Sequence, residues 1–280
     1  MTKVFQLPTC PSNPDTLPIG PQYPWLAPLA GYSDLPFRLL CREYGAAVCV
    51  TEMVSAKGLV YESPGTNELL MTLPEDQPLV VQLFGAEAYF LGRAVELLRQ
   101  AGYGWFDLNM GCSVSKVLRQ SAGAAMLGDT KNVLVVARAM IEAAGSGRVG
   151  FKLRLGLDDA RPVLPDLALR LEDAGAGWLT LHPRTARQGF GGAAQWAGLE
   201  RAENAPVPFA YVAPLREDAG AQESNNGYYQ VITNTFGVIV VVPNCADERG
   251  QDAGRWLEVL RPEIFRAILS WHMKPKDEFS

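Results

Sequence analysis

The sequence predicts an α/β fold: a partial (β/α)8 barrel of the TIM type, with about six βα units, followed by a small α+β segment. Short apolar runs alternate with longer segments of helical periodicity from residue 23 to about 205. Nearly every expected strand ends in a polar or reactive residue, and in a barrel those ends converge on one face. After Asn204 the alternation stops.

Six strands and four helices account for the alternating region. The expected strands are Trp25–Leu29, Ala47–Met53, Leu79–Leu83, Trp105–Asn109, Gly150–Arg154 and Trp178–His182. The expected helices are Leu35–Tyr44, Ala88–Ala101, Lys131–Ala144 and Leu164–Ala174. Asp34 is placed to cap the first helix, and a glycine follows each helix where it should end.

The pattern divides the chain into three parts. Residues 1–22 form a loose lead-in, residues 23–205 the barrel portion, and residues 206–280 the α+β segment, with the boundary at about residues 203–208. The last part reads as an apolar segment, a polar loop, a β-rich run and an amphipathic helix, at Phe209–Leu215, Arg216–Gly227, Tyr228–Val242 and about Asp247–Trp271.

Composition narrows the class of protein. A net charge of −5 argues against an indiscriminate nucleic-acid binder, although a local basic groove remains compatible with it. The five cysteines are an odd number without CxxC spacing, which argues against a disulfide framework or a structural zinc site. The first 20 residues lack the pattern of a signal peptide, and no run reaches the length of a membrane span. We therefore expect a soluble cytoplasmic protein without membrane partners.

Cys112 is the residue best placed for chemistry. The segment Asp107-Leu-Asn-Met-Gly-Cys112 ends a strand and enters a loop at the expected barrel mouth. A cysteine close to backbone amides can serve as a nucleophile or as an acid. The competing interpretation is a small buried hydrophobic residue, which is the one we adopt for Cys41 and Cys49.

Cations and a histidine end two later strands. Lys152 and Arg154 share one face of their strand, because side chains alternate with a period of two. They either meet an anionic or electron-rich ligand or form a pair of solvated charges at the rim. His182 is either structural or functional, and its neighbours in the segment Leu-His-Pro-Arg-Thr-Ala-Arg favour function. His272 is interpreted as a surface residue.

Two further strand ends leave their roles open. Glu52 is equally suited to be a base, a hydrogen-bonding anchor or an ion-pair partner. Gln82 can both donate and accept, which suits the edge of a heterocycle. The sequence contains no GxGxxG, Walker lysine loop or HExxH, so dinucleotide-fold, P-loop and zinc-protease interpretations lack support. No metal site is predicted.

Several short motifs occur in a fixed order between residues 23 and 200. They are Ala27-Pro-Leu-Ala-Gly-Tyr-Ser-Asp-Leu-Pro-Phe-Arg38, Thr51-Glu-Met-Val54, Gln82-Leu-Phe-Gly85, Asp107–Cys112, Gly123-Ala-Ala-Met-Leu127, Lys152-Leu-Arg154 and His182-Pro-Arg-Thr185. Together they resemble the tRNA-dihydrouridine synthases. The resemblance implies a TIM barrel with FMN, which NADPH reduces and which then gives hydride to C6 of a uracil in tRNA.

The resemblance also implies roles by position. Cys112 is the acid that protonates C5 of the uracil, and Asn109 lies in the uracil pocket. The residues implied to contact the flavin ring and its side chain are Gln82, Lys152 and His182. Pro28, Leu29 and Ala30 line the isoalloxazine with their backbone. Arg154 and Arg184 are substrate-side or phosphate-side cations, and a cation near the flavin N1 stabilises the anionic reduced ring.

The chain departs from that family pattern in two ways. Ser113 stands where the family usually has a proline, which changes the stiffness of the loop. The last two strands of the family hold the FMN phosphate with an Asn-Gly-Asp motif and a Gly-Arg motif. From Val207 onward neither motif stands on an expected strand, and the chain lacks the tRNA-binding helical domain. We therefore expect two open strand edges, weak FMN retention and impaired activity.

The tail has a resemblance of its own. The segments that carry it are Ala210–Gly220, Thr233–Val242 and Asp247–Gly250. They are similar to the C-terminal part of phage tail terminator proteins, which are ring-forming structural subunits without a cofactor. This resemblance implies homo-oligomers formed through the C-terminal segment. The alternative function is therefore a structural tail-terminator-like protein without catalytic activity.

Overall fold

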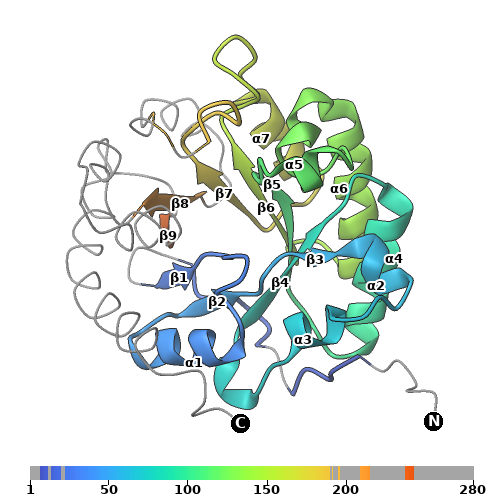
Figure 1. Ribbon diagram of the computed structural model, residues 1–280, viewed down its shortest axis with the longest axis vertical. Helices are drawn as coiled ribbons and strands as arrows, with labels where there is room; N and C mark the ends of the chain where they lie inside the picture. Colours follow the sequence, from blue (N-terminus) through green and yellow to red (C-terminus); the bar gives the residue numbers. More distant parts are fainter. Residues whose placement is uncertain are drawn as a thin grey trace.

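In the computed structural model, eight strands pair around a closed ring. The structure describes residues 7–11, 14–19, 23–189, 191 and 195, and the strands at 209–214 and 237–242. The strands are β1 (Pro24–Leu26), β2 (Val48–Val50), β3 (Val54–Ser55), β4 (Leu79–Phe84), β5 (Phe106–Met110), β6 (Val149–Arg154), β7 (Trp178–His182), β8 (Phe209–Pro214) and β9 (Gly237–Val242). Their order is β2-β1-β9-β8-β7-β6-β5-β4, and β4 pairs back to β2 (Figure 1). The short strand β3 pairs with the end of β4.

The six strands expected from the sequence are all present, and wherever two of them pair they run parallel to each other. The expectation of two open edges is wrong. β8 pairs parallel to β7, and β9 pairs antiparallel to both β8 and β1. The physical reason is that an open edge leaves a row of backbone N–H and C=O groups unpaired, and the two strands of the tail satisfy them. A reversed final strand therefore closes the barrel.

The helices lie outside the ring. The longer ones are α1 (Leu35–Glu43), α4 (Ala88–Gln100), α6 (Thr130–Ala144) and α7 (Asp166–Asp173), which confirms the four expected positions. The short elements, which the sequence did not indicate, are α2 (Ala56–Val60), α3 (Thr66–Leu70), α5 (Ser115–Leu118), and the 3-10 turns η1 (Pro74–Asp76) and η2 (Gly123–Gly128). Asp34 caps α1 by accepting from the Phe37 amide at 3.0 Å. The expected terminal helix at Asp247–Trp271 lies outside the described residues.

Two apolar cores lie on opposite faces of the strands. The outer core packs residues such as Phe106, Leu108 and Met110 of β5 against α4 and α6. The inner core fills the barrel near the starts of its strands, and its members are Trp25, Ala27, Val48, Val50, Val80, Trp105 and Trp178. Because strand side chains alternate, the same β5 that feeds the outer core turns Asp107 and Asn109 inward.

Tryptophans close the inner core, and the lead-in segment caps them. The rings of Trp25 and Trp178 meet edge to face at 5.5 Å between centroids, and Trp105 lies 6.2 Å from Trp178. The indole of Trp25 donates to the carbonyl of Pro18 at 2.9 Å, and that of Trp105 to Pro14 at 3.1 Å. A buried indole N–H needs an acceptor. The described part of the lead-in is therefore bound to the barrel rather than loose.

A buried ion pair fixes the segment between α1 and β4. Arg38 and Asp76 are 1% and 0% exposed, and their charged groups meet at 2.8 Å. The remaining donors of Arg38 go to the carbonyls of Ser33 and Met71, at 2.8 and 2.7 Å. A buried pair with its hydrogen bonds satisfied is costly to break from one side. It ties the loop after β1 to the turn before β4.

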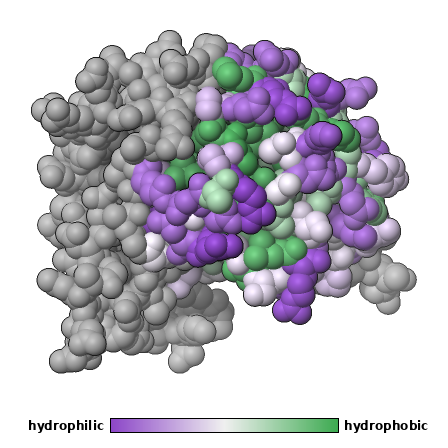
Figure 2. All heavy atoms as spheres, turned by 90° about the horizontal axis from the view of Figure 1, so that it is seen from above, coloured by the Kyte–Doolittle hydropathy of each residue, from purple (hydrophilic) through white to green (hydrophobic). Residues whose placement is uncertain are grey.

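Polar side chains cover most of the described surface on the face shown in Figure 2, with apolar patches between them. Among the large apolar residues with high exposure are Tyr61, Tyr89 and Val114. Within the described part of the chain, no helix is both long enough and apolar enough to cross a bilayer.

Gly150 on β6 is a sharp test of the inner core. A Cβ built at this residue would overlap the indole of Trp178 on the neighbouring strand. We expect Gly150→Ala to lower the free energy of unfolding by about 1–3 kcal/mol, because the tryptophan must move within a packed interior. Urea unfolding measures the loss. Gly85→Ala is the matched control, since a Cβ at Gly85 would make only ordinary contacts, 3.5 Å or longer. Equal losses for the two variants would contradict the packing described here.

Candidate active site

The carboxyl ends of β4 to β7 bring five of the expected site residues onto neighbouring strands. In the strand register Gln82 lies beside Asp107, Asn109 beside Lys152, and Arg154 beside His182. The interior positions along β6 are Gly150, Lys152 and Arg154, so polar groups lie above the tryptophans on one side of the barrel. The convergence predicted from the strand ends is therefore present.

Cys112 lies on the loop after β5, and hydrogen bonds hold both its backbone amide and its backbone carbonyl. Its N–H donates to Oδ1 of Asn109 at 2.9 Å, and its carbonyl accepts from the Ala124 amide at 2.9 Å. Gly123 has a φ of +61°, and a Cβ there would lie 2.6 Å from the Cys112 carbonyl oxygen. The loop after β5 can approach η2 this closely only because that residue is glycine.

The other described cysteines are buried, whereas Cys112 is half-buried. Burial raises the pKa of the Cys49 thiol to about 12 and that of Cys41 further still. A buried thiol with a raised pKa is chemically inert. Cys41 and Cys49 are therefore apolar core residues, as the sequence suggested, and Cys112 is the accessible thiol among the described residues.

Beneath the Cys112 loop, three side chains form a chain of hydrogen bonds. Asn109 accepts from the Gly111 and Cys112 amides through Oδ1, and its Nδ2 donates to Oε1 of Gln82 at 2.8 Å. Nε2 of Gln82 donates to Oδ2 of Asp107 at 2.7 Å. Gln82 has no exposed surface, and its backbone N–H donates to the Thr51 hydroxyl at 3.1 Å. Both ends of the Gln82 amide are therefore occupied within the protein.

Lys152 and Asp107 are the charged groups of this interior. Burial raises the pKa of Asp107 to about 7, although the Gln82 hydrogen bond and the nearby Lys152 oppose the rise. Burial also lowers the pKa of Lys152 to about 8, helped by Arg154 and opposed by Asp107 and Cys112. Among the described residues the side chain of Lys152 makes no hydrogen bond or ion pair, and Oδ1 of Asp107 is buried without a hydrogen-bond partner. A half-buried ammonium without a partner is suited to an anionic or electron-rich ligand.

Arg154 ties two loops of the barrel mouth together. Its Nε donates to the Gly111 carbonyl at 2.7 Å, and its Nη1 donates to the carbonyls of Gly189 and Thr185 at 2.7 and 3.2 Å. Arg154 is 2% exposed, and burial, together with the neighbouring Arg184, lowers its pKa to about 10. Its observed contacts join the Cys112 loop to the loop that follows β7.

His182 is held as a neutral ring. Burial lowers its pKa to about 2, and the cations of Lys152, Arg154 and Arg184 add to this effect. Nε2 of His182 lies 3.2 Å from Nη1 of Arg184. Because a guanidinium can only donate, Nε2 is the acceptor and the ring proton is on Nδ1. The structure thus defines the tautomer, which the sequence left open.

The loop after β1 forms another wall of the mouth. Pro28 and Leu29 are half-buried and Ala30 is exposed. The Leu29 amide donates to the Ser33 hydroxyl at 3.0 Å, and the Gly31 amide donates to the carboxylate of Glu52. Of the three roles left open for Glu52, the contacts favour the hydrogen-bonding anchor. It joins the loop after β1 to the end of β2.

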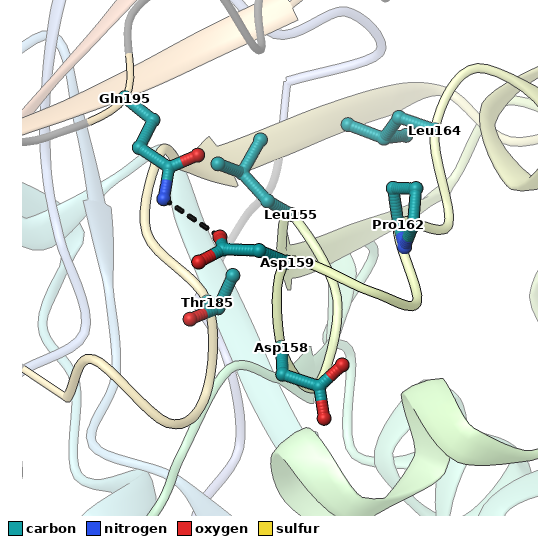
Figure 3. Close-up of a pocket in the computed structure, with 7 residues that line it drawn as sticks. All are labelled: Leu155, Asp158, Asp159, Pro162, Leu164, Thr185 and Gln195. Carbon is teal, nitrogen blue, oxygen red and sulfur yellow. Dashed lines mark hydrogen bonds between the residues drawn. The ribbon is translucent and has the colours of Figure 1, made fainter.

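A pocket of about 280 Å³ lies beside this site, between the loops that follow β6 and β7. The residues that line it are Leu155, Asp158, Asp159, Pro162, Leu164, Thr185 and Gln195 (Figure 3). Asp159 accepts from Gln195 at 2.9 Å, and Asp158 pairs with Arg161 and Arg187. Both carboxylates of this pocket therefore already have partners. In the described part of the chain, no group of three or more His, Cys, Asp or Glu side chains could hold a metal ion.

Asp107 is the site residue that our sequence interpretation passed over. It lies two positions before Asn109 and therefore on the same face of β5. That spacing was the available signal. What the sequence could not show is that the carboxylate accepts from Gln82 rather than from a solvent-exposed cation.

Comparison with known proteins gives a family match for each part of the chain. Residues 25–210 match the family model described as dihydrouridine synthase, and residues 185–279 match the model of the phage tail terminator protein. The chain therefore belongs to the dihydrouridine synthase family. Its C-terminal part is similar to phage tail terminators, and the two matches overlap at residues 185–210.

Individual relatives point the same way. A probable tRNA-dihydrouridine synthase of Rhizobium leguminosarum bv. phaseoli is 36% identical over 174 residues, which covers 62% of this chain and 54% of the relative. The tRNA-dihydrouridine synthase B of Pseudomonas aeruginosa is 34% identical over 185 residues, covering 65% and 55%. The chain spans about half the length of the curated relatives it matches. Among solved structures, morphinone reductase in complex with tetrahydroNAD aligns with a TM-score of 0.43 at 12% identity, covering 78% of this chain and 85% of its own.

The neutral state of His182 predicts a specific dependence of stability on pH. Its pKa is lowered in the folded state, so below about pH 6.5 the unfolded chain binds a proton that the folded chain does not. This residue's contribution to stability is therefore lost as the pH falls from about 6.5, with a slope of up to about 1.4 kcal/mol per pH unit.

His182→Gln keeps an acceptor for Arg184 but cannot titrate. We expect the difference in unfolding free energy between the wild type and this variant to be constant above pH 7, and to shift in favour of the variant as the pH falls from 6.5 to 4. Urea unfolding at each pH measures the difference. A difference that is independent of pH would mean that His182 titrates alike in both states.

Proposed function

We propose that this chain carries out the FMN-dependent, NADPH-driven reduction of the C5=C6 bond of a uridine in tRNA, with Cys112 as the proton donor. One observation carries the proposal: an accessible thiol at the barrel mouth, on a loop fastened by Asn109 and Arg154, beside the ammonium of Lys152. An acid and a cation next to each other suit a reaction in which a hydride and a proton are added to one double bond.

The residues present fit the ring of a flavin. Lys152 has no partner among the described residues and lies next to the Cys112 loop, where an electron-rich ring would stabilise its charge. The half-buried backbone of Pro28 and Leu29 forms a wall for the same ring. His182 is neutral, and Arg184 holds its ring at Nε2. A bound flavin supplies the hydride.

The chain's own groups manage the proton and the base. Cys112 carries the proton on Sγ and delivers it to C5 of the uracil, which must be taken out of the stacked RNA to reach the mouth. One Nδ2–H of Asn109 points at Met53 Sδ, 3.9 Å away, and would donate to the uracil in its place. We assign Arg184 to the substrate side. The primary role of Arg154 is to hold the loops.

Cys112→Ala separates the two half-reactions. The thiol is needed only to protonate the uracil, so we expect NADPH to reduce the bound flavin at an unchanged rate. The reduction of uridine in tRNA should fall by about 10²- to 10⁴-fold, the usual contribution of a general acid. Stopped-flow flavin absorbance follows the first step and dihydrouridine analysis of the tRNA the second. A parallel loss of both would exclude the role of a simple proton donor.

The phosphate of FMN is the part for which we identify no binding motif. The barrel closes through β8 and β9, and their sequences lack the Asn-Gly-Asp and Gly-Arg motifs that the family uses. We therefore infer that the ring, and not the phosphate, supplies most of the binding energy, and that FMN is retained weakly.

This inference predicts that riboflavin binds as well as FMN. If no group holds the phosphate, the two dissociation constants should agree within about threefold. A phosphate held by charge-assisted hydrogen bonds would add about 1.5–3 kcal/mol, or more than tenfold. Fluorescence titration of the purified protein gives both constants. Retention of stoichiometric FMN, but not riboflavin, through dialysis would show that a phosphate site exists.

The second candidate function is structural. The match of residues 185–279 to the phage tail terminator model favours it. In that case residues 206–280 would join copies of the chain. A protein that forms rings in electron micrographs and binds no added FMN would support this function, whereas a protein that binds added FMN and tRNA supports the first.

A further inference from the structure

The strongest further signal is the row of amides and a carboxylate beneath the Cys112 loop. It runs from the Cys112 and Gly111 backbone through Asn109 and Gln82 to Asp107. These three side chains are at most 7% exposed. If one of these side-chain amides were rotated by 180° inside the closed barrel, its N–H group would face another donor and its oxygen another acceptor. Unpaired polar groups in a buried site are costly.

The direction of every bond in this row follows from its first member. A backbone N–H can only donate, and two of them, at 3.1 and 2.9 Å, point at the same oxygen of Asn109. The other end of that amide must then be Nδ2, which donates to Gln82. Gln82 must therefore present Oε1 to Asn109 and Nε2 to the next residue. That residue has to be an acceptor, and it is Asp107.

We propose that Asp107 is a positioning residue, which fixes the orientation of the Gln82 and Asn109 amides and thereby fastens the Cys112 loop. An ionised carboxylate is suited to this place because it accepts in either rotamer and has no proton to donate to a reversed Gln82 amide. With an acceptor fixed at one end and backbone donors at the other, only one orientation of both amides satisfies all the bonds.

Fixed orientation also decides what the barrel mouth presents. The carbonyl ends of both amides are turned into the row, so the remaining hydrogens are N–H donors. One of them, on Asn109, faces Met53 Sδ, a weak acceptor that a better one can replace. The site is therefore set to receive acceptor atoms, such as the carbonyl oxygens of a heterocycle. This consequence rests on the proposed function, whereas the row itself does not.

Variants that exchange donors for acceptors in this row of hydrogen bonds test the proposal. Gln82→Glu keeps an acceptor for Asn109 but sets a carboxylate against Asp107. Asp107→Asn removes that conflict, because its amide can donate to the new carboxylate. We expect Gln82→Glu to lower the thermal midpoint by roughly 5 °C or more, and Gln82→Glu with Asp107→Asn to recover most of the loss. Asp107→Asn alone still offers an oxygen to Gln82 and should cost less.

A second pair tests the other link. Asn109→Asp forces Gln82 to turn its Nε2 towards the new carboxylate, so that its oxygen faces Asp107. The same Asp107→Asn should rescue this variant too, because both side-chain bonds of the row are then reversed, while the two backbone N–H groups still donate to residue 109. If one of the two single variants does not fold, the recovery of soluble protein in its double variant, together with the other pair, decides the question.

The rate of Cys112 alkylation by iodoacetamide reports on the loop itself. Peptide mass spectrometry follows the modification at Cys112 across pH in the full chain, without flavin or tRNA. We expect the pH–rate profile to shift in Gln82→Glu and to return to within about threefold of the wild type in the double variant with Asp107→Asn. A residue that only stabilised the barrel would leave this profile unchanged.

Asp76→Asn is the matched control, since Asp76 is also a fully buried aspartate but pairs with Arg38. It should destabilise the protein and rescue neither variant. Additive effects of Asp107→Asn in both pairs, or an unchanged Cys112 profile throughout, would overturn the proposal. Failure of the uridine-reduction assay alone would count against the proposed function and leave the row of hydrogen bonds standing.

Discussion

The exclusion of water from a closed barrel is the constraint on which the rest of this structure depends. Strands that alternate their side chains must place half of them inside, and polar groups there must find partners within the protein. The lower interior avoids the difficulty with tryptophans and valines, and the indole N–H groups of Trp25 and Trp105 donate to carbonyls of the lead-in segment. In the upper interior the polar side chains are paired by the row of hydrogen bonds that runs from Asp107 to the Cys112 amide.

The groups suited to chemistry lie where the pairing of buried polar groups is incomplete. Lys152 has no partner among the described residues, Asp107 has one oxygen without a hydrogen bond, and Cys112 is the accessible thiol. Around them the loops are joined by hydrogen bonds: Arg154 donates to three carbonyls, and Glu52 anchors the loop after β1. Reactive groups held on fixed loops are what a barrel mouth requires for oriented transfer of a hydride and a proton.

Closure of the ring and possession of a cofactor site are separate matters. β8 and β9 satisfy the backbone of β7 and β1 by pairing alone, which any extended apolar segment can do. Holding a phosphate needs particular loops at the strand ends, and pairing does not supply them. A chain whose last two strands come from the region that resembles tail terminators can therefore complete the fold of the dihydrouridine synthase family without completing its phosphate site.

The sequence by itself determined the local structure and the composition of the site. Alternating apolar runs located six strands and four helices, and the strand-end residues located Cys112, Asn109 and Lys152 at one mouth, because period and burial are encoded locally. Only the tertiary structure decided that β9 closes the ring in reverse, that Gln82 is turned inward, and that Asp107 belongs to the site. Each of those facts is a pairing between residues distant in the chain. Such pairings are selected by which buried groups are left without a partner when everything else is in place.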